Sequence, residues 1–216
     1  MATAAATPTP DLSADDFAIL RRIGRSVRFG ARRYLYHQDD PAQAVYLIES
    51  GLVKQARLTE TAREVVLDFL GAGDLLGAFD LLDLRLTDGF AQAIEPTEAR
   101  VIRRQDFEAV VTDRPALLLA VTRVVARRAR LLGERLAAQS SHDAGRRLAD
   151  LLDRLVARFG VPTDRGMAVP RGLTHVDLAN YIGSARETVT ELLAGFARAR
   201  KVERQGRTII IVRSRP

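Results

Sequence analysis

The sequence contains no cysteine at any of its 216 positions. Disulfide bonds, thiolate metal sites, iron–sulfur clusters and thiol redox sensing need that side chain, so all of them are excluded. Histidine is scarce as well, because only His37, His142 and His175 are present and they fall in different predicted elements. A metal centre needs clustered ligands, so none is expected. No nucleophile–base pair or lysine-bearing phosphate loop is evident, and we do not expect an enzyme.

Long apolar runs are missing too. No run reaches the roughly 18 residues that a membrane-spanning helix requires. Residues 1–10 lack the cationic start and apolar stretch of a signal peptide, so a cytoplasmic protein without membrane contact is expected. With 47% apolar and 28% charged residues the chain can form real cores, which excludes wholesale disorder.

Positive charge is concentrated in the last third of the chain. Residues 1–141 carry 19 basic and 19 acidic side chains, whereas residues 142–216 carry 14 basic and 8 acidic ones, so the whole formal charge of +6 lies there. Such a field attracts a phosphate backbone, and neutralising phosphates releases counterions. The pattern favours a nucleic-acid partner, although an arginine-rich composition also leaves some region positive by chance.

The first half of the chain reads as a tail, a short helix and a set of strands. Residues 1–12 are predicted to be a disordered tail, and Ser13 then begins a helix that stops at Gly24. From about 26 to 103, apolar strands alternate with turn markers. The predicted strands are 27–29, 45–48, 52–53, 65–70 and 99–102. Their spacing is typical of an antiparallel sandwich or barrel.

A long helix is expected between Pro115 and the Ser141-His142-Asp143 segment, because proline suits a first helical turn and the next one is Pro162. Positions 118, 122, 125, 129, 132, 136 and 139 form a coiled-coil-like stripe in which five of the seven residues are apolar. Its charged flanks favour a homodimer seam made by Leu118, Val125, Ala129, Leu132 and Leu136. The alternative is that this stripe packs on the chain's own domain. A second amphipathic helix follows and ends at Gly160, with Leu148, Leu151, Leu152, Leu155 and Val156 on its apolar face.

The segment after Thr174 carries the strongest functional pattern. Thr174 can cap a helix whose buried face is Leu178, Ala179 and Ile182, and Gly183 supplies a tight turn. Ser184 and Glu187 match an S-x-x-E capping box, which predicts a second helix from Ser184. Its predicted buried residues are Val189, Leu192, Leu193 and Phe196. Two short helices joined in this way form a helix-turn-helix, whose second helix enters the DNA major groove.

The exposed side of that second helix holds the candidate base readers, because arginine binds guanine O6 and N7 and a carboxylate accepts from cytosine N4. Its residues are Ala185, Arg186, Glu187, Thr190 and Glu191, with Thr174 and Ser184 beside them. Lys201 to Val212 alternates around Gln205-Gly206, which predicts a hairpin wing that places Arg204 and Arg207 on phosphates.

Each of two candidate base readers has an alternative role that stays open. For Glu187 the alternative is to serve only as the capping-box partner. For Arg186 it is to be a solvated residue at the start of a helix. A cation at a helix start opposes the helix dipole, which favours a functional reason for Arg186.

The segments G-S-A-R-E-T-V-T (183–190) and R-x-G-R-T-I-I-I (204–211) resemble the winged-helix end of the cyclic-AMP receptor protein / fumarate-nitrate reductase regulator (CRP/FNR) superfamily. Four further segments resemble its β-roll and dimer helix: L-Y-H-Q-D-D (35–40), V-Y-L-I-x-x-G-L-V (45–53), G-D-L-L-G (73–77) and V-A-R-R (125–128). The resemblance covers nearly everything after residue 13.

The resemblance implies an α+β fold in three parts. An N-terminal antiparallel β-roll of the jelly-roll, cyclic-nucleotide-binding type occupies 13–113, a dimerisation helix 114–141, and a winged helix-turn-helix domain 142–216, with a hinge near His142-Asp143. It also implies a homodimeric transcription regulator that reads a pseudo-palindromic site in double-stranded DNA and contacts RNA polymerase.

The effector pocket departs from the family's pattern. Cyclic-AMP binders carry a Glu after the G-D-x-x-G glycine and an Arg-Ser pair for the phosphate. Here Gly77 is followed by Ala78, and the pair corresponds to Thr87 and Asp88. An aspartate repels an anion, and no arginine is expected nearby for bidentate capture, with Arg85 held as a reserve candidate. The family's purine-reading pair corresponds to Leu132-Gly133.

We therefore expect no tight binding of cyclic AMP and no cofactor. Two options remain for regulation. Either an unidentified apolar small molecule binds in the β-roll, or there is no effector and the amount of the protein itself sets the response. His37 is expected to be a hydrogen-bonded turn residue rather than a haem ligand. Glu191 stands where the family commonly has Arg or Lys, so base preference beside the Arg186 contact is expected to shift or relax. The competing function is a cyclic-nucleotide- or small-molecule-sensing interaction module with no role on DNA.

Overall fold

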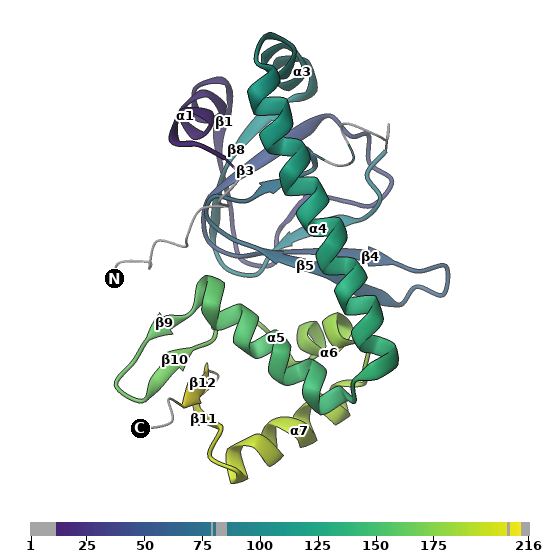
Figure 1. Cartoon of the computed structure of the whole chain (residues 1–216), viewed down its shortest axis with the longest axis vertical. Coiled ribbons are helices and arrows are strands. Elements are labelled where there is room, and N and C mark those ends of the chain that lie inside the picture. The colour runs from purple at the N-terminus through teal and green to yellow at the C-terminus, as the bar shows by residue number, and fades with distance from the viewer. Residues whose placement is uncertain (1–11, 79, 81–85, 207, 213–216) are drawn as a thin grey trace. The chain divides into compact units, whose positions relative to one another are not determined.

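The structure is a computed structural model that describes residues 12–78, 80, 86–206 and 208–212 (Figure 1). The chain divides into two compact units, with the boundary between Glu134 and Arg135. Among the described residues, no helix is long and apolar enough to cross a membrane.

Two four-stranded antiparallel sheets build the first unit. One has the order β1-β8-β3-β6, which are Arg25–Phe29, Thr97–Arg103, Ala44–Ser50 and Leu75–Leu76. The other has the order β2-β7-β4-β5, which are Tyr34–Tyr36, Phe90–Ala93, Val53–Leu58 and Glu64–Leu70. Both sheets contribute to one apolar cluster, made by Tyr36, Ile48, Val53, Leu70, Leu76, Ala91 and Ala99. The predicted antiparallel β-roll is confirmed.

Three described helices pack against the first sheet through a second apolar cluster. They are α1 (Ala14–Ile23), α3 (Arg104–Asp113) and the first half of α4 (Pro115–Ser141). Ser13 caps α1 and Gly24 ends it, as predicted. Leu12 is 7% exposed and belongs to this cluster, so its assignment to the tail is wrong: burying its side chain ties it to the core. The rest of the predicted tail lies outside the described residues.

Helix α4 has two different apolar sides. The side that packs on the β-roll buries Leu117, Ala120, Val121 and Val124. The predicted seam is not used for this contact. Leu118, Leu132 and Leu136 are 37, 42 and 72% exposed, Ala129 is exposed and Val125 is half-buried. The alternative, a helix that packs on its own domain, holds for the first half of α4, but this packing uses the other apolar side and does not cover the seam.

The second unit contains α5 (Ala144–Phe159), α6 (His175–Ile182), α7 (Arg186–Arg198) and a four-stranded sheet (Figure 1). Asp143 caps α5 and Gly160 ends it, which confirms the predicted break after Ser141. The sheet has the order β11-β12-β10-β9, which are Val202–Gln205, Thr208–Val212, Gly166–Ala168 and Val161–Pro162. Since α5 packs on both α6 and α7 and the β11–β12 hairpin follows α7, this unit is a winged helix-turn-helix.

Candidate nucleic-acid interface

Helix α6 is delimited by two local signals. At its start the Thr174 hydroxyl oxygen accepts from the Asp177 N–H at 3.1 Å, and the Asp177 carboxylate accepts from the Thr174 N–H at 2.9 Å. This reciprocal pair satisfies two backbone donors that the helix itself leaves without partners. At its end Gly183 adopts φ 64°, ψ 49°, the left-handed conformation that glycine takes without steric penalty.

The predicted capping box at Ser184 is wrong. The Ser184 N–H donates to the Ala179 carbonyl at 3.0 Å, a hydrogen bond that closes the end of α6. Helix α7 then begins at Arg186, with Ala185 as its N-cap and no side chain bonded to the cap. Because Ser184 closes the preceding helix, α7 begins two residues later than expected. The alternative that confines Glu187 to this box is wrong as well.

Helices α4 and α5 hold the C-terminal end of α6. The Arg135 guanidinium lies 3.7 Å from the centre of the Tyr181 ring and donates to the Tyr181 carbonyl at 2.6 Å. Arg147 donates to the Ile182 carbonyl at 2.9 Å, and Arg154 donates to the Tyr181 hydroxyl at 2.9 Å. Cations are favourable at a helix C-terminus, where carbonyls lack helical partners. The turn that leads into α7 is thus held by side chains from two other helices.

A side chain at Gly183 is strained mainly by the backbone, because φ there is +64°. A Cβ would also lie 2.7 Å from Nε2 and 2.9 Å from Oε1 of Gln139, the end of an exposed α4 side chain that has to move aside. Gly183→Ala should therefore lower the free energy of unfolding by about 1–3 kcal/mol, measured by chemical denaturation. Gly195→Ala is the matched control, because a Cβ inside α7 would meet only the end of Arg198, at 3.9 Å. That control should be neutral or stabilising. Equal losses in both variants would contradict the strain argument.

The N-terminal part of α7 presents one polar face. Arg186, Glu187, Thr190 and Glu191, called the reading surface below, are exposed, as is Ala185 before them. Their spacing places them on one side of the helix. Val189 and Leu193 on the other side are buried, while Leu192 and Phe196 are half-buried. The predicted exposed face is confirmed, and of the predicted buried residues Val189 and Leu193 are confirmed.

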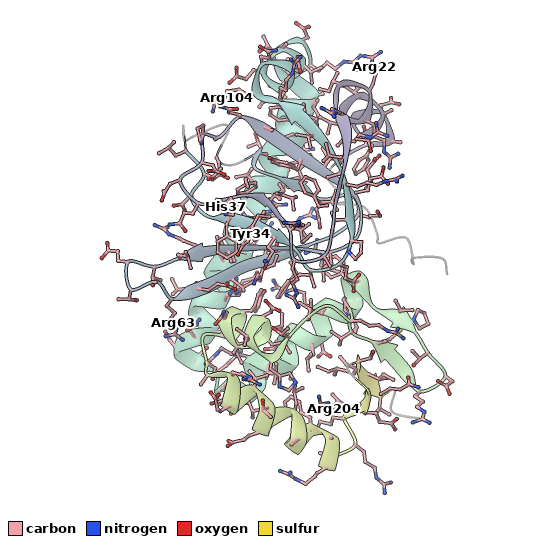
Figure 2. The ribbon with its side chains drawn as sticks, turned by 180° about the vertical axis from the view of Figure 1, so that it is seen from behind. Arg22, Tyr34, His37, Arg63, Arg104 and Arg204 are labelled. Carbon is pink, nitrogen blue, oxygen red and sulfur yellow. The ribbon has the colours of Figure 1, made fainter. Side chains whose placement is uncertain are left out.

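The wing is the β11–β12 hairpin. Its register runs from Val202 opposite Ile211 to Gln205 opposite Thr208, and Gly206 at the turn has φ 60°. This confirms the predicted hairpin, and Arg204 is exposed on β11 (Figure 2). Arg207, the other predicted phosphate contact, lies outside the described residues.

His175 is a residue of this region that the sequence patterns did not single out. It is the first residue of α6, and its Nδ1 lies 2.8 Å from the Thr190 hydroxyl on α7. Burial, followed by the charges of Arg204 and Arg186, holds the pKa of His175 below its usual value. The three side chains therefore share one electrostatic environment, although they come from α6, α7 and the wing. A lone histidine gives no local signal of such a placement.

The candidate effector residues lie in different environments. Ala78 is buried, and the buried Thr87 donates its hydroxyl to the His37 carbonyl at 2.6 Å. Gly77 has φ 80°, and Leu132 is exposed on α4. Asp88 accepts from Arg57 Nη1 on β4 at 3.2 Å, so the expectation that no arginine lies nearby is wrong. Arg57 and Asp88 are far apart in sequence. The pairing of β4 with β7, in which Ala56 lies opposite Phe90, brings Arg57 close to Asp88.

A second carboxyl lies next to Asp88. The Asp80 carboxylate accepts from the Asp88 N–H at 3.2 Å, and burial raises the pKa of Asp80. Two carboxyl groups thus lie together here, and Arg57 is paired with one of them. Arg85, the reserve candidate, lies outside the described residues.

His37 lies in a turn. Its backbone N–H donates to the Asp40 carboxylate at 2.7 Å, and its ring lies 4.4 Å from that of Tyr34, centre to centre (Figure 2). The expected turn role is confirmed. No group of three or more potential metal ligands occurs within the part of the chain that the structure describes.

Comparison with known proteins gives two family matches. Residues 26–114 match the cyclic nucleotide-binding domain, and residues 146–216 match the Crp-like helix-turn-helix domain. The chain is 29% identical to the CRP-like cAMP-activated global transcriptional regulator of Mycobacterium tuberculosis, over 90% of this chain and 87% of that protein. It is 31% identical to the cyclic AMP receptor protein of Thermus thermophilus, over 76% of this chain and 72% of that protein.

A solved structure shows the same fold. The c-di-GMP responsive global regulator of Xanthomonas campestris superposes with a TM-score of 0.80 at 19% identity, covering 94% of this chain and 100% of that one. At that identity the likeness concerns the fold alone.

Proposed function

Because the chain belongs to the CRP/FNR superfamily and is a DNA-binding transcription regulator rather than an enzyme, we propose that it acts as a homodimer. In this proposal each protomer reads one half of a pseudo-palindromic promoter site through α7. The observation that carries the proposal is the reading surface, four polar residues exposed on one face at the start of α7. In helix-turn-helix proteins the start of the second helix contacts base edges.

Arg186 and the carboxylates have complementary roles in this reading. Arg186 donates to guanine O6 and N7, and Glu187 or Glu191 accepts from a cytosine amino group. The Thr190 hydroxyl donates to the Arg186 carbonyl at 3.0 Å, so its position follows that of the helix backbone. Glu191 supplies only acceptors where the family commonly has a cation, so the base beside the Arg186 contact differs from the family's usual choice. Thr174 and Ser184 lie beside this surface, with Thr174 engaged in the α6 cap.

Dimerisation is supported by the exposed seam of α4. Leu118, Leu132 and Leu136 remain in contact with solvent in the single chain, at the spacing of a coiled coil. Two copies that pack along the seam remove these side chains from water. A two-fold dimer presents two copies of α7 to half-sites about one helical turn apart, ~34 Å.

The direct test is selection of bound fragments from genomic DNA with the purified full chain, followed by gel shifts. We expect an enriched, two-fold symmetric sequence that binds much more tightly than a shuffled duplex of the same composition. Equal affinity for both duplexes, or no binding to either, would contradict the proposal. The second outcome would favour a sensing module without a DNA role. RNA polymerase as a partner and a cytoplasmic location belong to the same proposal.

Arg204 serves as a phosphate contact in this proposal. Arg204→Ala should weaken binding to selected and shuffled duplexes by a similar factor, because phosphates carry no sequence information. It should also reduce the slope of log affinity against log salt by about one per protomer. Arg22→Ala, which removes an exposed charge from α1, is the control and should leave the slope unchanged. A sequence-selective loss in Arg204→Ala would assign that side chain to a base instead. Arg207 is proposed to act in the same way.

We also propose that regulation does not require cyclic AMP. The M. tuberculosis relative is described as cAMP-activated, so this nucleotide is the first ligand to test. Calorimetry should show no submillimolar affinity, because Asp88 and Asp80 repel the phosphate and Arg57 is already paired. Asp88→Ser removes one carboxylate and frees Arg57, so any gain of affinity should appear in that variant. Submillimolar binding by the unmodified protein would refute the proposal, which leaves an unidentified small molecule or no effector.

A further inference from the structure

A short hydrogen-bond chain links α6 to the reading surface. The Thr190 hydroxyl has one proton and donates it to the Arg186 carbonyl at 3.0 Å. The Thr190 hydroxyl oxygen also lies 2.8 Å from His175 Nδ1. In the tautomer that matches donation of the hydroxyl proton to Arg186, Nδ1 carries the ring proton and Nε2 carries the lone pair. The ring can take up a proton at Nε2 without losing its contact with Thr190.

The charges that act on His175 most strongly are positive. They belong to Arg204 on β11 and Arg186 on α7. On its own helix, Asp177 is engaged with the Thr174 cap. The arginines that α4 and α5 contribute to α6 bind the opposite end, at Tyr181 and Ile182. Burial and the two nearby cations thus favour the neutral ring and hold the pKa of His175 below its usual value.

We propose that His175 is a further DNA-contacting residue, which takes up a proton when the duplex binds and donates it from Nε2 to a backbone phosphate. This inference rests on the proposed function, because it requires the duplex to lie on the reading surface. Arg186 and Arg204, whose charges act on His175, are the residues assigned to bases and phosphates. A phosphate beside them reverses the local potential, which then favours the imidazolium instead of the neutral ring. The proton comes from solvent, and no covalent bond changes.

Proton uptake makes DNA affinity depend on pH in a defined direction. The ring has a lower pKa in the free protein than in the complex, so the complex binds more protons between these two values. Affinity therefore rises as pH falls through the pKa of the complex and levels off below the pKa of the free protein. Each unit by which the duplex raises the pKa gives about a tenfold change in affinity per protomer. Ordinary carboxylates stay ionised above about pH 5.5, so this range reports on histidine.

The experiment measures the dissociation constant of the selected duplex by fluorescence anisotropy at constant ionic strength, from about pH 5.5 to about pH 8. The variant is His175→Asn, whose amide nitrogen takes the place of Nδ1 and keeps a donor for Thr190 but does not titrate. The control is His142→Asn, at the α4–α5 junction, where the ring is 42% exposed. We expect affinity to rise on acidification in the unmodified protein and in His142→Asn, and to be nearly independent of pH in His175→Asn. With three histidines in the chain, NMR titration of the imidazole signals should also show a higher pKa for His175 in the complex.

The outcomes separate this inference from the proposed function. If His175→Asn keeps the full pH dependence, or if the pKa of His175 does not rise on DNA binding, the inference is wrong while sequence-specific binding stands. If the unmodified protein binds no duplex at any pH, the proposed function fails and this inference fails with it. A loss of affinity in His175→Asn with an unchanged slope assigns the ring a purely structural role and also overturns the inference.

Discussion

Replacing Leu136 by glutamate is expected to convert the dimer to a monomer. Leu136 is the most exposed leucine of the seam, at 72%, and belongs to the same stripe as Leu118 and Leu132. Burying one such side chain contributes about 1.5–3 kcal/mol, and the two-fold axis doubles each contribution. A glutamate forfeits this contribution and places two like charges near each other across the interface. Light scattering or analytical ultracentrifugation reports the mass directly.

The same variant should lose most of its affinity for the selected duplex. A dimer gains affinity because the second half-site binds at a high effective concentration, and a monomer loses this gain, about a hundredfold or more. Leu58→Glu is the matched control, since Leu58 is an exposed leucine, at 42%, that lies on β4 and not on α4. It should remain dimeric and bind DNA. A dimeric Leu136→Glu, or a monomeric unmodified protein, would show that the seam is not the interface.

Arg186→Ala should produce the largest loss of sequence discrimination. A bidentate contact of arginine with guanine favours guanine over another base by about 1–3 kcal/mol. A two-fold symmetric operator contains this contact twice. The affinity for the selected site should fall while the affinity for a shuffled duplex changes little. Competition gel shifts with duplexes altered at one symmetric pair of positions would locate the affected base.

Arg186→Lys provides the sharper control for this experiment. Lysine keeps the positive charge but cannot form the planar pair of hydrogen bonds. We expect a salt dependence close to that of the unmodified protein together with reduced discrimination at the same base pair. If Arg186→Ala and Arg204→Ala gave the same profile across sequences and salt, the division into base and phosphate contacts would be wrong.

Local patterns predicted several helix boundaries, but they missed α3 and failed at Ser184. Ser13, Asp143 and Thr174 begin helices, and Gly160 and Gly183 end them, because a cap acts within a few residues of backbone. The predicted capping box at Ser184 fails because the Ser184 backbone N–H donates to the Ala179 carbonyl at the end of α6. It is therefore not available to the Glu187 side chain. Two local motifs competed for one residue, and the pattern alone did not show which would form.

The weakest part of the sequence analysis is the β-roll. The strands β2, β6 and β7 were missed, because each has only two to four residues and β7 reads Phe-Ala-Gln-Ala. Such segments have little preference of their own and become strands by pairing with neighbours that are distant in the chain. The same reason explains the unexpected contact between Arg57 and Asp88, which are 31 residues apart.

The amino-acid sequence by itself determined the division into a β-rich part, a long helix and a winged helix-turn-helix, and the polar face at the start of α7. These depend on helical periodicity, capping and turn chemistry, which operate between residues about four positions apart or closer. Only the tertiary structure decided which side of α4 remains exposed, which side chains hold the turn at Gly183, and that His175 contacts Thr190 under the influence of Arg186 and Arg204. Those relations join residues 11 or more positions apart, as His175 and Arg186 are, and such distances close only when the elements pack.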